Sequence, residues 1–128
     1  FPINDDWIYA ESVKHFLESG KLRLLACAPA CVFQILSAAL FCKIFGFSYG
    51  LLRLTGFAFA VAGSFALYGS CRLLQLPKLT AALFALCLAA NPLYLSLAFS
   101  FMTDTPALAL TLLYVFFLFQ GLKKQSEL

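Results

Sequence analysis

Four long apolar runs fill most of the chain and leave little polar surface for a soluble fold. They cover residues 24–45, 54–71, 79–97 and 107–119. A helix needs about 20 apolar residues to cross the roughly 30 Å hydrocarbon core of a bilayer. Each run is near that length, the last one only if its helix starts near Asp104. The pattern predicts an all-α integral membrane protein, a multi-pass helical bundle, because helices satisfy their backbone hydrogen bonds internally in lipid.

The sparse charges exclude several other classes of protein. Only 12% of the residues are charged, about half the share found in soluble domains. The basic residues are scattered and form no Arg-rich run, so nucleic acid is not an expected partner. The five cysteines lie in apolar runs without a Cys-x-x-Cys pair or a nearby histidine, so no zinc site is predicted. We expect no cofactor, and the sequence leaves a need for a divalent metal open.

Residues 5–19 have the pattern of a short amphipathic helix. Apolar side chains such as Trp7, Val13 and Leu17 recur at helical spacing between charged ones. Asp5 or Asp6 could cap its start, and Gly20 would end it. The segment is too short and too charged to span, so we expect it at the membrane surface.

Small residues recur on one face of the second apolar run. Gly56, Ala60, Gly63 and Ala66 follow one another at helical spacing. Small residues let helix backbones approach closely in lipid, where no hydrophobic force drives helices together. The spacing predicts that this face packs against a neighbouring helix.

The charges allow two topologies. If all four runs span, Asp5 and Asp6 lie on the opposite side from Asp104, and the positive-inside rule makes the Asp5-Asp6 side cytoplasmic. If residues 24–46 instead lie along the surface, three runs span and the three acids share one face. The cytoplasmic face then carries four basic residues in short loops: Arg72, Lys78, Lys123 and Lys124. Charge alone favours four spans.

The acidic residues at the ends of the runs are the candidate chemical groups. As plain structural residues, Asp5, Asp6 and Asp104 would cap helices or face solvent. If they meet at one pocket mouth, one carboxylate can take the proton of an acceptor hydroxyl that attacks a sugar carbon. A lipid-phosphate leaving group would need a cation, and three residues could supply it: Lys21, Arg23 and Arg53.

Three motifs, in this order, resemble the amino-terminal part of GT-C membrane glycosyltransferases of family 39 and the RgtA/B/C/D-like kind. The first is Asp-Asp-Trp-Ile-Tyr at 5–9, which fits the family's Asp-Asp/Glu-x-x-Tyr. The second is Phe-Gly-Phe-Ser at 45–48, followed by Arg53. The third is Met-Thr-Asp-Thr-Pro at 102–106. One departure is Ala28-Pro29, where many relatives have His-Pro-Pro or Lys-Pro-Pro.

The resemblance implies a GT-C-like fold and a sugar-transfer activity. Residues 1–53 would form an outer loop with amphipathic and surface helices, and residues 54–128 would hold spans at about 54–73, 79–101 and 105–122. It thereby favours three spans over four. The family's first spanning helix would precede Phe1, so we expect the chain to be a fragment of a longer protein.

The same resemblance implies the substrates and the site. A polyprenyl-phosphate sugar would be the donor, and the acceptor stays unknown. The site would lie on the non-cytoplasmic face, in a bacterial plasma membrane. Asp5 would be the base, supported by Asp6 and Asp104, while Tyr9 and Arg53 would bind substrate. A fragment alone would be inactive.

Two other classes of function fit the same residues. A multi-pass transporter or flippase-like protein could line an ion or lipid path with these acids. A non-catalytic membrane subunit would use them only as helix caps. Transport that depends on a gradient would indicate the first, and unchanged function after all three Asp→Asn substitutions would indicate the second.

Overall fold

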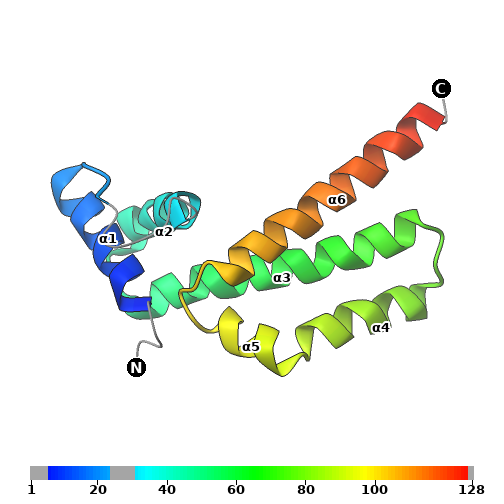
Figure 1. Ribbon diagram of the computed structural model, residues 1–128, viewed down its shortest axis with the longest axis horizontal. Helices are drawn as coiled ribbons and strands as arrows, with labels where there is room; N and C mark the ends of the chain where they lie inside the picture. The colour runs from blue at the N-terminus through cyan, green and yellow to red at the C-terminus, as the bar shows by residue number, and fades with distance from the viewer. Residues whose placement is uncertain (1–5, 24–30, 127–128) are drawn as a thin grey trace.

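The computed structural model describes residues 6–23 and 31–126 of the chain (Figure 1). Within them it contains no strand, which confirms the all-α prediction. The helices are α1 (Asp6–Ser19), α2 (Val32–Phe45), α3 (Tyr49–Leu73), α4 (Lys78–Ala89), α5 (Pro92–Ala98) and α6 (Asp104–Ser126).

Helix α3 is the centre of the arrangement. It packs against α6 on one side and against α4 on the other, while α1 and α2 lie at the end where α3 and α6 begin (Figure 1). In the described part of the chain, α3 and α6 are long and apolar enough to cross a membrane, and α4 with α5 makes a third span if the bent pair is counted as one. These findings confirm a multi-pass helical membrane protein.

The α4–α5 pair is bent by 65°, because the chain carries a helix stop and a new helix start at the same place. Asn91 Oδ1 accepts hydrogen bonds from the backbone N–H groups of Leu93 (3.0 Å) and Tyr94 (3.1 Å). Pro92 follows as the first residue of α5, where its missing N–H costs nothing. The segment expected to be one helix over 79–101 is therefore two helices at an angle.

Helix α2 is shorter than a membrane span. Its 14 residues extend about 21 Å at 1.5 Å per residue, less than the hydrocarbon core. It ends at Gly46, whose φ of +85° favours glycine. Figure 1 shows α2 nearly end-on while α3 and α6 lie in the plane of the view, so α2 crosses their direction. Residues 24–30 of the same apolar run lie outside the described residues. The boundary at residue 53 between an outer loop and the spanning helices stays a prediction.

The small-residue face of α3 packs closely, as its spacing predicts. Gly56, Ala60, Gly63 and Ala66 are all buried. A Cβ added at Gly63 would lie 3.1 Å from the Cα of Ala109 in α6, and one at Gly56 would lie 2.7 Å from the Ser100 carbonyl oxygen. The contacts at these positions leave no space for a larger side chain without movement of the neighbouring backbone.

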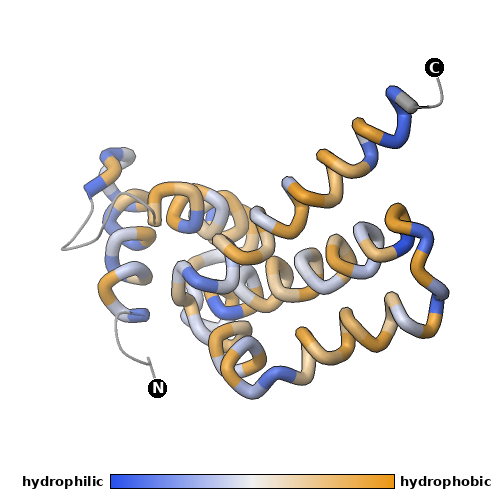
Figure 2. The backbone as a smooth tube through the Cα atoms, turned by 45° about the vertical axis from the view of Figure 1, so that its right-hand side comes forward, coloured by the Kyte–Doolittle hydropathy of each residue, from blue (hydrophilic) through white to orange (hydrophobic). Residues whose placement is uncertain are grey.

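The two ends of the bundle differ in charge. Figure 2 shows the tube apolar along α3, α4 and α6 and hydrophilic at the α3–α4 connection and in the last turns of α6. Four basic residues lie at that end: Arg72, Lys78, Lys123 and Lys124. Asp6 and Asp104, at the starts of α1 and α6, lie at the other end. Charges of both signs occur there, and the basic residues among them are Lys14, Lys21, Arg23, Lys43 and Arg53.

Candidate functional site

Asp6 points into the protein rather than toward solvent. Positions 6, 10 and 13 share one face of a helix, and here Asp6, Ala10 and Val13 are all buried. Only 3% of the Asp6 surface is exposed. A buried carboxylate needs hydrogen-bond donors to offset its lost hydration.

A backbone amide far along the chain supplies such a donor. The N–H of Phe101 donates to Asp6 Oδ1 at 2.6 Å, across 95 positions of sequence. Phe101 lies in the connection between α5 and α6, three residues before Asp104. Three steps of 3.8 Å limit the Cα–Cα distance from Phe101 to Asp104 to about 11 Å. The fold thus brings Asp6 beside the segment that carries Asp104.

Gln34 of α2 binds the same connection from another direction. Its Nε2 donates to the carbonyl oxygens of Phe101 (2.9 Å) and Met102 (3.2 Å). Only 3% of Gln34 is exposed. Gln34 lies within the first apolar run and was not among the predicted site residues. A lone amide in such a run was the available signal, since a buried amide must find partners.

The side chain of Phe101 completes the attachment of this connection. It is 2% exposed and lies in a cluster that joins α1, α2 and α3, with Val13, Ile35 and Leu52 among its members. Side chain, N–H and carbonyl of one residue are thus all held by other elements. The connection that leads into Asp104 is a packed part of the fold.

Asp104 is exposed, in contrast to Asp6. It is the first residue of α6, where the partial positive charge of a helix start favours a carboxylate. With Asn91, Tyr94 and Thr105 it lines a cavity of about 230 Å³ between the α4–α5 bend and α6. The Thr105 hydroxyl is buried without a hydrogen-bond partner among the described residues. Asp104 can therefore reach a molecule outside the protein, and the buried Asp6 carboxylate is engaged within it.

The other predicted site residues lie at the same end or outside the described part. Tyr9 packs against the Phe101 cluster and is half-buried. Arg53 is half-buried in the second turn of α3, next to buried Leu52. Lys21 and Arg23 are exposed after α1. Asp5 lies outside the described residues, and the described ones contain no group of three His, Cys, Asp or Glu residues that could hold a metal ion.

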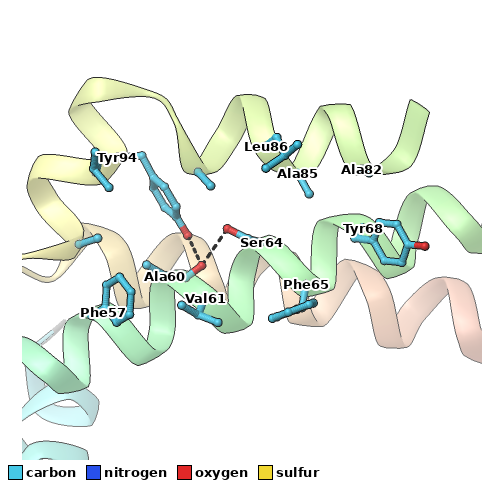
Figure 3. A pocket seen from close by; sticks show the side chains of 13 residues that line it. Phe57, Ala60, Val61, Ser64, Phe65, Tyr68, Ala82, Ala85, Leu86 and Tyr94 are labelled. Carbon is cyan, nitrogen blue, oxygen red and sulfur yellow. Dashed lines mark hydrogen bonds between the residues drawn. The ribbon is translucent and has the colours of Figure 1, made fainter. Parts of the chain in front are cut away.

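A larger cavity lies along the bundle between α3 and the α4–α5 pair (Figure 3). It has a volume of about 490 Å³, and no charged side chain is among its described lining residues. The hydroxyls of Tyr94 (2.9 Å) and Ser64 (3.0 Å) both donate to the Ala60 carbonyl oxygen. These two hydroxyls thus bond to the protein itself, and the walls of this cavity are mostly apolar.

One family model matches the chain, that of the dolichyl-phosphate-mannose-protein mannosyltransferases, over residues 30–128. The matched part contains Gln34, Arg53 and Asp104, and it begins after Asp5, Asp6 and Tyr9. The chain matches no curated protein and no solved structure at a significant level.

Proposed function

Because the chain belongs to the dolichyl-phosphate-mannose-protein mannosyltransferase family, a family of membrane glycosyltransferases, we propose that it transfers a sugar from a polyprenyl-phosphate donor. The acceptor would be a hydroxyl at the non-cytoplasmic face of the membrane. The observation that carries the proposal is the hydrogen bond from the Phe101 N–H to Asp6. It supports one acidic site at the end where α3 and α6 begin.

The charge distribution supports the orientation. Short loops at the cytoplasmic ends of spanning helices carry an excess of Lys and Arg. The basic end defined above, with Arg72 and Lys78 around the α3–α4 connection, therefore faces the cytoplasm. Asp6 and Asp104 then face the opposite compartment, together with α1 and α2.

The two neighbouring acids have different roles. Asp6 is buried and accepts a hydrogen bond from the backbone, so it supports the site by holding the α5–α6 connection. We assign the base to Asp5, which takes the proton of the acceptor hydroxyl. Asp104, exposed beside a cavity, orients the acceptor.

The proposed sugar transfer forms one bond and breaks one bond, and Asp5 takes the proton that is released. The acceptor oxygen forms a bond to the anomeric carbon, the bond from that carbon to the phosphate oxygen breaks, and polyprenyl phosphate leaves with the electron pair. Arg53 binds the phosphate, for which a guanidinium offers paired N–H donors. Tyr9 lies one helical turn from Asp5 in sequence and contacts the substrate.

A transfer assay tests the proposal. Membranes that contain the full-length protein receive polyprenyl-phosphate mannose with a radiolabelled sugar. We expect the label to move into lipid-free material and polyprenyl phosphate to accumulate, with or without an ion gradient. Gradient-dependent transport without any sugar transfer would contradict the proposal and indicate a transporter.

A further inference from the structure

We propose that Gln34 is a positioning residue that holds Asp104 in place for sugar transfer. The proposal rests on the function proposed above, because it matters only if Asp104 takes part in the reaction. Gln34 does not contact Asp104. It acts through the α5–α6 connection, whose last residues lead directly into the first turn of α6.

The backbone of Phe101 is bound from two sides. Its N–H is bonded to Asp6 of α1, and its carbonyl oxygen is bonded to Gln34 of α2. Gln34 also binds the next carbonyl oxygen, that of Met102, through the same nitrogen. In the predicted outer loop, Asp6 of α1 thus holds one peptide group just before Asp104, and Gln34 of α2 holds the next two.

An amide is the side chain that suits this position. Its nitrogen carries two N–H donors, one for each carbonyl oxygen. An apolar residue of the same shape would leave two carbonyl oxygens without this donor, which destabilises the connection. The Gln34 Oε1 has no partner among the described residues, so the two donated bonds set the orientation of the amide.

The position of Gln34 on α2 links the site to the outer loop. Gln34 lies on the buried face of that helix together with Ile35, Ala38 and Cys42. Any shift of α2 would therefore pull on the two peptide groups. A misplacement of about 1 Å can cost about 100-fold in rate, so we expect the position of α2 to control the turnover rate.

Two substitutions in the full-length enzyme test the role. Gln34→Met keeps the length of the side chain and removes both donors, and we expect kcat to fall about 10- to 100-fold with KM for the donor lipid nearly unchanged. Gln34→Glu restores a donor only when its carboxyl group is protonated. Burial beside the two carbonyl oxygens, next to the residue that Asp6 binds, raises the pKa of that carboxyl.

The pH profile separates positioning from packing. The activity of Gln34→Glu relative to wild type should rise as the pH falls, because the protonated form can again donate to the Phe101 carbonyl oxygen. Gln34→Met should show a constant ratio at every pH. Gln75→Glu, the same change at an exposed site of the basic end, should match wild type. A kcat for Gln34→Met within two-fold of wild type, or a flat ratio for Gln34→Glu, would overturn the proposal.

A second readout needs no sugar transfer. In a cysteine-free protein with Thr103→Cys, the rate of maleimide labelling should rise several-fold when Gln34→Met is added and stay unchanged with Gln75→Glu. An unchanged rate with Gln34→Met would overturn the positioning contact itself. Faster labelling in a protein that transfers no sugar would refute the proposed function alone.

Discussion

Replacing Asp5 by Asn in the full-length enzyme should lower kcat for sugar transfer by about 100- to 10,000-fold, the range that general base catalysis contributes. Asparagine keeps the size and the polar character of the side chain but cannot accept the proton of the acceptor hydroxyl. KM for the donor lipid should change little, because Asp5 has no assigned contact with the phosphate. Initial rates of label transfer in membranes measure both constants.

The control for this substitution is Glu18→Gln. Glu18 is an exposed acid near the end of α1, and the change removes one negative charge from the same helix. Its rate should stay within two-fold of wild type. If Asp5→Asn also stayed within two-fold, Asp5 would not be the base, and the assignment would be wrong whatever the sugar.

Replacing Phe101 by Ala should destabilise the folded enzyme by about 3–5 kcal/mol, the usual cost of removing a fully buried aromatic side chain. The ring is 2% exposed where α1, α2 and α3 meet the α5–α6 connection. Its removal leaves a cavity that these four elements cannot all close at once. Thermal unfolding of the purified enzyme in detergent measures the change.

Phe99→Ala is the matched control for this loss. Phe99 belongs to the same connection, is 56% exposed and stacks on Phe57 of α3 with ring centroids 5.2 Å apart. Its loss should cost about 1 kcal/mol, the value of such an aromatic pair. Equal melting temperatures for the two variants would show that Phe101 does not hold the connection.

The sequence was sufficient for the fold class because hydrophobicity and charge directly reveal membrane helices. The long apolar runs, the small-residue face with Gly56 and Gly63, and the short polar breaks all have a visible pattern. The α4–α5 bend also had a signal, Asn91-Pro92, since an N-cap residue followed by proline is typical of a new helix. That signal was present within a run predicted to be one span.

The interior of the site could not be predicted, because its contacts join distant parts of the chain. An aspartate at a helix start is normally a cap or a solvated residue, and nothing near Asp6 in sequence indicates that it is buried. Its partner is an amide N–H, which every residue except proline carries and which therefore leaves no pattern. The contacts of Gln34 could not be predicted for the same reason, because its two acceptors are backbone carbonyl oxygens 67 and 68 positions away.

We expect the end of the bundle that carries Asp6 and Asp104, from α1 to the start of α6, to face the non-cytoplasmic side. Side-specific labelling of single cysteines in the cysteine-free full-length enzyme tests it, with Ser48→Cys, Gln75→Cys and Asp104→Cys, all at exposed positions. In right-side-out vesicles an impermeant maleimide should label positions 48 and 104 at once and position 75 only after the membrane is opened. Labelling of positions 48 and 104 from opposite sides would contradict the account, because the acidic site could then not assemble.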